Sequence, residues 1–273
     1  MLRNTFLIII TLLTFYSAFA QKDSINIYKV LYERTLSIEE GRKPFIGVYE
    51  LNKFVELNKS IYTKKSKSKI TEVVITDEDD DSRFTFTPTG KNISTLFKDY
   101  NNGTFYSKHE VAYKYFVVKD SLNIFNWSIQ NNSKEILGFK CQLATMDFRG
   151  RKYEAWFTSD LPVGGPYKYD GLPGMILELK SIDNFISFKP IKIKNTKLKL
   201  ATLENPFDTK DALTWQDYKD LYKKKAIELL SYRPNENTGG VVSSRGGIEL
   251  YIDEDDKEYN DALDKYHKKF SKN

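Results

Sequence analysis

The sequence has very few of the residue types that most catalytic and metal centres use. Its 273 residues include one cysteine and two histidines. A single cysteine, Cys141, cannot form an intramolecular disulfide, so the fold must be held by its core. It falls in an alternating strand pattern, where we expect a small buried side chain. His109, which we place on a loop, and His267 offer no ligand pair for zinc and lie in no recognisable catalytic motif.

Motifs for other common chemistries are also missing. The sequence contains no phosphate-binding glycine loop and no nucleophile elbow. Two acidic runs, 77–81 and 253–256, lack the glycine and terminal glutamate of a calcium loop, which favours solvated loops. The formal charge of +5 is small, with acids and bases mixed, and it predicts no basic face for nucleic acid. We therefore expect no cofactor, no metal and no nucleic-acid partner.

The first twenty residues have the pattern of a secretory signal peptide. Arg3 provides the positive start, residues 6–15 form an apolar run, and Ala18, Phe19 and Ala20 make a cleavage site of the A-x-A type. The run is too short to span a membrane. We expect export to the periplasm or the medium, cleavage before Gln21, and a mature chain without a transmembrane segment.

The rest of the chain is dominated by strand patterns. Tyrosine and phenylalanine are abundant, at eighteen each, and alternating apolar runs are joined by short polar turns such as 101–103. At Pro190 the alternation slips by one residue, which predicts a bulge, and a proline there favours an edge strand. The fold class predicted is mainly β (β-rich α+β): a curved antiparallel meander sheet packed on one or two helices.

The clearest helix spans residues 215–230. Thr214 is a good N-cap, and an apolar stripe along the helix predicts that it lies on the sheet. We expect one domain over 21–232 that includes this helix at 214–230. A flexible linker rich in glycine, serine and asparagine follows at 233–250, and then a charged tail at 251–273. The spacing of the tail's aromatic residues fits either a docked helix or a segment without fixed structure.

A proline–glycine corner is the most distinctive local feature. Pro173 followed by Gly174 predicts a type II turn, and Leu172 before the proline is pushed toward extended geometry. Nearby, Arg151 is expected either to stack on an aromatic ring or to hold a carboxylate such as Asp160 or Asp170. The residues singled out as a binding or structural corner are Arg149, Arg151, Trp156, Tyr167, Tyr169, Gly171, Leu172, Pro173 and Gly174.

These residues carry a resemblance to a known family. The segment 171–176 (Gly-Leu-Pro-Gly-Met-Ile), together with Trp127 and the motifs at 136–141, 148–151 and 155–158, resembles the GLPGLI family of exported Bacteroidetes proteins. The resemblance implies an exported protein of unknown function, without established catalytic residues. More distantly, the pattern is similar to periplasmic lipoprotein-carrier folds, in which a curved sheet shelters acyl chains.

Three functions fit these observations. The favoured one is a non-catalytic envelope protein that binds an apolar ligand or an envelope partner, which predicts an apolar concavity between sheet and helix. The first alternative is an envelope hydrolase in which Asp160, Asp170 and Glu178 converge with Arg149 or Arg151. The second is a pure protein–protein interaction module, with an exposed apolar patch or a free sheet edge.

Overall fold

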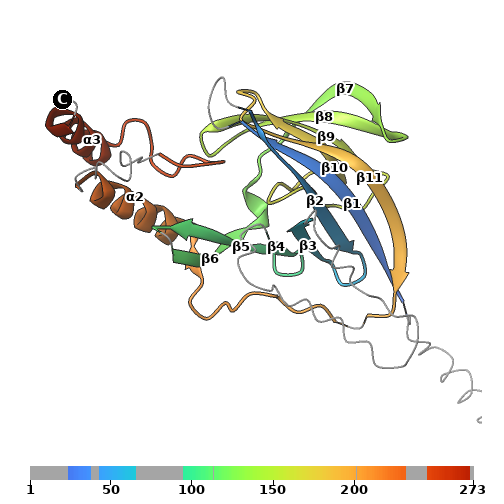
Figure 1. The fold of residues 1–273 in the computed structure, drawn as a ribbon. Helices are drawn as coiled ribbons and strands as arrows, with labels where there is room; N and C mark the ends of the chain where they lie inside the picture. The colour runs from blue at the N-terminus through green and yellow to red at the C-terminus, as the bar shows by residue number, and fades with distance from the viewer. Residues whose placement is uncertain are drawn as a thin grey trace, which may run out of the picture.

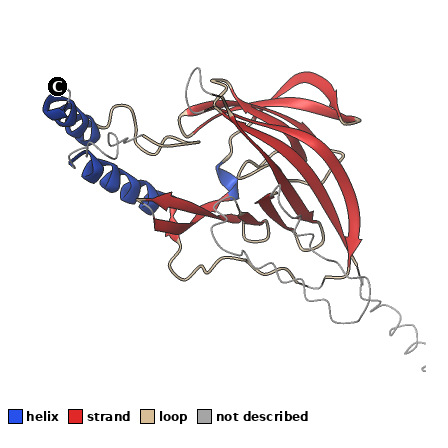
Figure 2. Cartoon of the chain, viewed as in Figure 1, coloured by secondary structure: helices blue, strands red, loops and turns tan. Residues whose placement is uncertain are grey.

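The protein folds around one large, strongly curved sheet. The structure, a computed structural model, describes residues 24–37, 43–65, 95–112, 114–200, 202–231 and 245–270. These form a twelve-stranded sheet with the order β12-β6-β5-β4-β3-β2-β1-β11-β10-β9-β8-β7, together with the helices α2 and α3 (Figures 1 and 2). The prediction of a mainly β fold is confirmed. The signal peptide 1–20, the acidic run 77–81 and most of the linker, 232–244, lie outside the described residues.

The strands pair with antiparallel neighbours throughout, except that β12 is parallel to β6. In chain order they are β1 (Ile25–Leu36), β2 (Phe45–Phe54), β3 (Lys59–Lys64), β4 (Leu96–Asp99), β5 (Thr104–Val111), β6 (Lys114–Ser121), β7 (Ser128–Ile136), β8 (Phe139–Phe148), β9 (Arg151–Thr158), β10 (Met175–Ser181), β11 (Ile186–Leu198) and β12 (Leu213–Thr214). A 3-10 turn, η2 (Leu122–Ile124), separates β6 from β7.

Local signals in the sequence predicted the positions of turns and bulges better than they predicted which strands lie side by side. The hairpin at 101–103 is confirmed, with Gly103 at a φ of +61° between β4 and β5. The bulge at Pro190 is also confirmed, because the β1–β11 register shifts between Leu31 and Tyr32. The edge-strand prediction is wrong, since β11 lies between β1 and β10. The register with β10 covers only Ser187 and Phe188, so Pro190 lies beyond that ladder and its missing N–H interrupts no pairing with β10.

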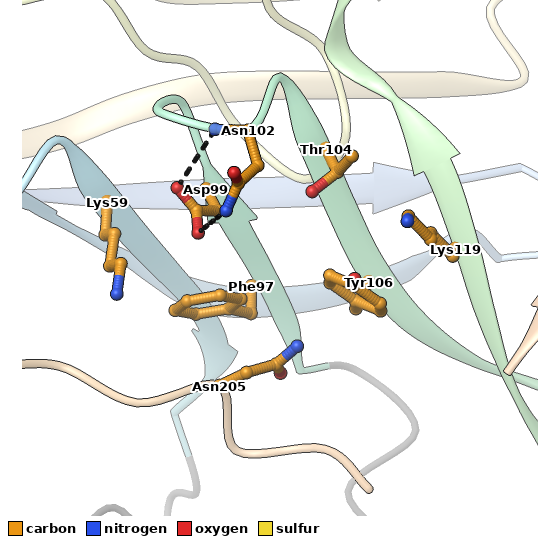
Figure 3. Close-up of a pocket in the computed structure, with 8 residues that line it drawn as sticks. All are labelled: Lys59, Phe97, Asp99, Asn102, Thr104, Tyr106, Lys119 and Asn205. Atoms are coloured by element: carbon orange, nitrogen blue, oxygen red, sulfur yellow. Dashed lines mark hydrogen bonds between the residues drawn. The ribbon is translucent and has the colours of Figure 1, made fainter. Parts of the chain in front are cut away.

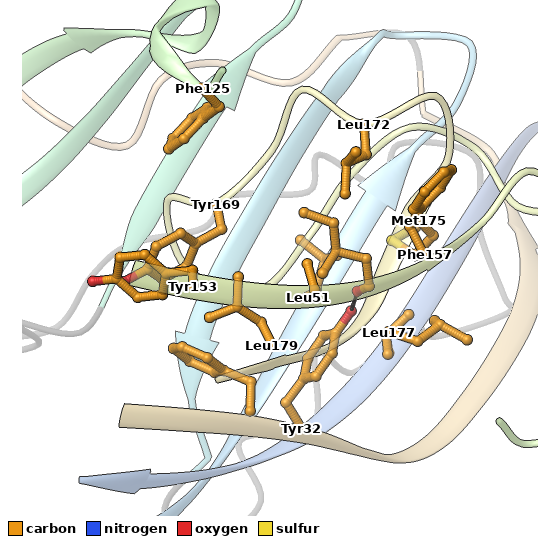
Figure 4. Packing of buried hydrophobic residues seen from close by; sticks show 14 of the residues in the cluster. Tyr32, Leu51, Phe125, Tyr153, Phe157, Tyr169, Leu172, Met175, Leu177 and Leu179 are labelled. Atoms are coloured by element: carbon orange, nitrogen blue, oxygen red, sulfur yellow. Dashed lines mark hydrogen bonds between the residues drawn. The ribbon is translucent and has the colours of Figure 1, made fainter. Parts of the chain in front are cut away.

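The inner face of the sheet, which carries Tyr32, Tyr49 and Tyr62, holds the main core. These side chains are almost fully buried, and the loop 159–174 supplies Leu161, Tyr169 and Leu172 to the same cluster (Figure 4). The Tyr32 hydroxyl donates a hydrogen bond of 2.6 Å to the Ile176 carbonyl. The predicted concavity between sheet and helix is therefore wrong. A loop fills this space, because its aromatic and aliphatic side chains reach the inner face directly.

A second, smaller core lies on the opposite, outer face. Phe54, Ile61 and Phe97 are covered by Leu203 and Phe207, which belong to the segment that crosses this face between β11 and β12. We call this segment, residues 202–212, the strap. It buries apolar side chains that a one-sided sheet would leave in water.

The helices lie at one end of the sheet. α2 (Trp215–Ser231) confirms the predicted helix, and its Thr214 cap is a reciprocal capping box. The Asp217 amide donates to Thr214 Oγ1 at 3.1 Å, and the Thr214 hydroxyl donates to Asp217 Oδ2 at 2.6 Å. Only the first turns of α2 reach the sheet, through Trp215 and Tyr218.

The remainder of α2 packs on α3 (Lys257–Phe270), where the tail proves to be helical. Figure 1 shows both helices projecting from the β6 end of the sheet rather than covering it. The apolar side chains of α2 therefore pack on two partners: those of its first turns on the sheet, and those of its last turns on α3. Among the described residues, no helix is long and apolar enough to cross a membrane.

Two lysines are buried on the inner face. Lys53 is 2% exposed, and its ammonium nitrogen lies 3.2 Å from the centre of the Tyr100 ring and 3.5 Å from Asn58 Oδ1. Burial lowers the pKa of Lys53 from 10.5 to about 8, an effect that nearby Asp170 partly offsets and Lys98 increases. The folded state therefore binds the Lys53 proton more weakly than the unfolded state does.

Replacing Lys53 with methionine should stabilise the domain at neutral pH. Because the pKa of Lys53 is lower in the folded state, the unfolded state binds the proton first as pH falls from 10.5 to 8, and the free energy of unfolding decreases over that range. Below pH 8 both states are protonated and this loss of stability is constant. We expect Lys53→Met to raise the free energy of unfolding by about 1 to 3 kcal/mol at pH 7, with the gain shrinking above pH 8. Urea unfolding at several pH values measures this. The exposed Lys64→Met variant is the control, and equal curves for the two variants would contradict the prediction.

Candidate functional site

The proline–glycine corner is a tight turn of a different type from the one predicted. The Gly174 amide donates to the Leu172 carbonyl at 2.8 Å, which closes a three-residue γ-turn around Pro173 rather than a four-residue type II turn. Gly174 has a φ of +154°, and a Cβ there would lie 2.0 Å from the Thr158 carbonyl oxygen. The corner is therefore shaped by a close backbone approach, and this explains the glycine.

A buried ion pair fixes the loop that contains this corner. Lys98 Nζ donates to Asp170 Oδ2 at 2.8 Å, to the Tyr169 carbonyl at 2.9 Å and to the Gly165 carbonyl at 3.1 Å. The Tyr100 hydroxyl also donates to Asp170 Oδ2, at 2.8 Å. All three ammonium protons have acceptors, so this fully enclosed group holds the loop and has no free valence for a ligand.

The remaining corner residues also serve the core. Tyr169 is completely buried and Leu172 is 2% exposed, while Tyr167 packs at the edge of the same cluster. Gly171 has a φ of +87°. The indole of Trp127 donates to the Asp170 carbonyl at 2.7 Å and holds this end of the loop. Tyr167, Tyr169 and Leu172 thus pack in the core, whereas Gly171 and Pro173 are exposed.

Arg149 joins two distant parts of the sheet. It lies in the β8–β9 turn and donates to Asp120 of β6 at 2.5 Å and to Glu249 at 3.3 Å. Its guanidinium also lies 3.6 Å from the Trp215 ring centre. Glu249 is fully buried and pairs with Lys168 at 2.8 Å. Residues 245–250, which the sequence places in a flexible linker, are therefore fastened to this turn.

Arg151 stacks on an aromatic ring, the first of its two expected roles, with its guanidinium 3.9 Å from the centre of the Phe185 ring, but it holds neither of the expected carboxylates. It pairs with Asp183 in the β10–β11 turn and donates to the Ile248 carbonyl at 2.9 Å. Asp170 is taken by Lys98 instead. The prediction failed because the partner, Lys98, lies about seventy residues away, beyond the reach of any local pattern.

The three carboxylates of the hydrolase hypothesis do not meet. Asp170 is buried in the loop, Asp160 is exposed, and Glu178 pairs with Lys134 at 2.7 Å on the other face of the sheet. The Lys134 ammonium lies 4.4 Å from the centre of the Trp156 ring, so Trp156 covers that ion pair. A pair of carboxylates flanking one bond, as glycoside hydrolysis requires, is not formed by these residues.

The scarce histidine and cysteine are structural. His109 lies within β5, not on a loop, and its Nε2 is 2.8 Å from Ser107 Oγ. Burial, with smaller contributions from Lys168 and Arg149, lowers the pKa of His109 to about 3, so the ring is neutral at pH 7. Cys141 is buried as predicted, and burial raises its pKa to about 11. No three His, Cys, Asp or Glu side chains gather as a metal site within the described residues.

The outer face carries a hollow of about 460 Å³ beside the strap (Figure 3). We call it the outer hollow. Two rows of paired residues cross β3 to β6 and form its base. One row runs Phe97–Tyr106–Lys119 and the other runs Lys59–Asp99–Thr104. The residues that line it are Lys59, Phe97, Asp99, Asn102, Thr104, Tyr106, Lys119 and Asn205.

The outer hollow combines an aromatic base with a polar rim. Phe97 is almost fully buried and forms the floor, whereas the Tyr106 ring is only half-buried. Asp99 is engaged in the hairpin turn, because it accepts from the Asn102 amide at 3.4 Å and from Asn102 Nδ2 at 2.8 Å. Asn205 reaches the rim from the strap (Figure 3). Sites of this composition bind small molecules by an apolar surface and a few oriented polar groups.

A second hollow, of about 380 Å³, is more apolar. It lies where the β7–β8 turn approaches β1, β11 and Leu161, and we call it the end hollow. Leu137 and Ile191 are half exposed at its edge, at 49% and 48%. Its lining residues are Tyr28, Leu137, Phe139, Leu161, Ile191, Lys192, Ile193 and Asn195.

The fold and its surface hollows define a mainly β domain with an open sheet, whose candidate sites lie on the sheet faces. Residues 51–217, more than half of the chain, match the family model described as "N-glycanase peptide, N-terminal domain". The chain belongs to this family.

Two solved structures of PNGF-II are similar to this chain. The structure in space group P21 has 16% identity and a TM-score of 0.44, and it covers 74% of this chain and 34% of its own. The structure in space group C2 has 15% identity and a TM-score of 0.42, with 74% and 33% covered. This chain thus spans about a third of the length of those proteins. No curated protein matches.

The family match corrects the resemblance drawn from sequence motifs. The GLPGLI-like segment, Gly171 to Ile176, lies inside the range that matches the N-glycanase N-terminal family, so the assignment to the GLPGLI family is wrong. The motif describes a corner in which backbone meets backbone, where Gly174 is required by geometry.

Replacing Gly174 with valine should prevent folding. A Cβ would collide with the Thr158 carbonyl at 2.0 Å and with the Ser159 Cα at 2.9 Å, and we expect a loss above about 4 kcal/mol. Gly138→Val is a matched control, because its φ of +83° strains a side chain but nothing lies within 4 Å. That variant should lose about 1 to 2 kcal/mol. Circular dichroism and urea unfolding distinguish the two, and a Gly174→Val protein as stable as the control would refute the collision argument.

Proposed function

We propose that this protein is a non-catalytic binding domain and that its ligand is a carbohydrate bound in the outer hollow. The observation that carries the proposal is the combination of a half-buried aromatic ring, Tyr106, with amide and hydroxyl groups on one sheet face. The buried ion pairs and the neutral, enclosed His109 support a structural role for the titratable core groups.

The chemistry of the outer hollow suits a sugar ring. A pyranose has an apolar face of C–H groups and an equatorial belt of hydroxyls. The Tyr106 ring offers an apolar surface for the first, while Asn102, Thr104 and Asn205 offer donors and acceptors for the second. These polar groups lie at the rim of a partly apolar base, so they can fix orientation without a large desolvation cost.

The family supports the same ligand class. The description of the matching family names an N-glycanase, an enzyme that acts on glycans. Because the matching family model describes an N-terminal domain of such a protein, we assign recognition of a glycan to this domain.

One observation supports the apolar ligand that the sequence analysis favoured. The end hollow is lined mainly by aliphatic and aromatic side chains, and Leu137 leaves half of its surface exposed there. This is the second candidate function. The interaction-module alternative is less favoured, because the outermost strand, β7, is largely polar and shifts register between Ile129 and Ser133.

Export is part of the proposal. The signal-peptide pattern over residues 1–20 supports it, with cleavage between Ala20 and Gln21. Expression of the full chain in a Gram-negative host and mass spectrometry of the periplasmic protein test this step. A mass that begins at Gln21 is expected, and an uncleaved chain retained in the cytoplasm would rule it out.

A glycan-binding measurement tests the main function. We expect an oligosaccharide released from an N-glycoprotein to bind with micromolar to millimolar affinity by calorimetry, and Tyr106→Ala to weaken it at least tenfold, since stacking on the ring is lost. Ile129→Ala, an exposed change on β7 far from the outer hollow in strand order, is the control.

A long-chain fatty acid is measured in parallel as the probe of the end hollow. If the fatty acid binds, if Leu137→Asp removes that binding, and if no glycan binds, the apolar ligand replaces the carbohydrate. Leu137 already has a φ of +51°, a conformation that aspartate tolerates, so this variant should fold.

A further inference from the structure

We infer that the outer hollow selects carbohydrates that carry an anionic group, such as a carboxylate or a sulfate. The inference rests on the proposed function of the hollow and adds the charge class of the ligand. It is argued from the charges on the rim and from what each of them contacts.

Two cations flank the aromatic base. Figure 3 shows Lys59 and Lys119 on opposite sides of the Phe97 and Tyr106 rings. Lys119 is exposed and lies opposite Tyr106 in the β5–β6 ladder, so the two side chains are neighbours on the same face of the sheet. Among the described residues, no carboxylate forms a salt bridge with either lysine.

Among the residues that the structure describes, the Lys59 ammonium makes one hydrogen bond, which leaves its positive charge uncompensated. Its ammonium donates to the Leu203 carbonyl of the strap at 2.7 Å and lies 6.0 Å from the Phe97 ring centre. An ammonium has three donors, so two stay available for a ligand. A carbonyl oxygen orients the group but does not neutralise its charge.

Asp99, the only acidic residue among those that line the outer hollow, accepts hydrogen bonds within the β4–β5 turn. Its carboxylate accepts from the Asn101 amide at 3.0 Å as well as from the backbone and side chain of Asn102. These bonds close the β4–β5 turn and direct the negative charge into the hairpin. These donors are neutral and leave the charge of Asp99 in place, so the hollow presents two cations against one carboxylate, a net charge of +1.

This balance favours an acidic sugar over a neutral one and over a nucleic acid. An anionic substituent on a ring stacked at Tyr106 would meet Lys119 on one side or Lys59 on the other, and charge-assisted hydrogen bonds are roughly twice as strong as neutral ones. A nucleic-acid strand would need successive exposed rings, but Phe97 is only 2% exposed and offers no stacking face.

The test compares matched glycans at two salt concentrations. The probes are a biantennary N-glycan, the same glycan with two terminal sialic acids, and the same glycan with terminal sulfates. We expect the two anionic forms to bind about tenfold more tightly at low salt, with the ratio falling toward one at high salt because exposed charges are screened. Carboxylate and sulfate arms show which anion the two lysines prefer.

Variants assign the preference to the hollow. Lys119→Gln should reduce the anionic-to-neutral ratio at least threefold, and Lys119→Arg should restore it. Lys194→Gln is the matched control, because Lys194 is an exposed lysine on β11, three strands beyond β3 in the sheet, and does not line the outer hollow. Circular dichroism confirms that each variant is folded.

The outcomes separate this inference from the function beneath it. Equal affinity for neutral and anionic glycans, with binding lost in Tyr106→Ala, would overturn the charge preference and leave carbohydrate binding in place. Absence of binding to every glycan would overturn both. Tighter binding of a single-stranded oligothymidylate than of either acidic glycan would also overturn the inference, because the lysines would then serve a phosphate backbone.

Discussion

The enclosed ion pair between Lys98 and Asp170 is the interaction on which the arrangement of the inner face depends. It ties β4 to the loop 159–174, and that loop fills the curve of the sheet with its own apolar side chains. Without a fixed loop, the tyrosine-rich inner face would be exposed to water. Removing one partner would leave a buried charge without compensation, which is far more costly than losing a surface pair.

The same requirement explains why the core of this protein is rich in polar atoms. A loop cannot form ladder hydrogen bonds, so its carbonyls need other donors when they are buried. Lys98 supplies donors to the Gly165 and Tyr169 carbonyls, and Trp127 supplies one to Asp170. In this fold a lysine donates the hydrogen bonds to buried carbonyls that a neighbouring strand would donate within a sheet.

The sequence was informative wherever the determinant is local. Thr214 with Asp217 predicted the start of α2, the bulge at Pro190 could be read from a change of phase, and Gly103 marked a hairpin. It failed where the partner is distant. The partner of Asp170, the position of β11 inside the sheet and the contact of Arg149 with Asp120 all depend on strand order, which alternation alone does not encode.

The candidate site was missed for the same reason. Phe97 and Asp99 share a face by their two-residue spacing, but Tyr106 and Lys119 join them only through cross-strand register. Asn205 comes from the strap, whose path over the outer face has no local signal. The proline–glycine corner was singled out because its motif is easily recognised in the sequence, yet its buried side chains pack in the core.

The route of the strap has a consequence for how binding relates to the integrity of the fold. It leaves β11, near the middle of the sheet, and returns to β12 at the far edge, and on the way it supplies Asn205 and the carbonyl that orients Lys59. The outer hollow is thus assembled from strands in one half of the sheet and from a connection anchored in both halves. Under the proposed function, a nick along that connection would weaken ligand binding while the strands beneath remained paired, so ligand affinity would report on the closure of the chain over the sheet.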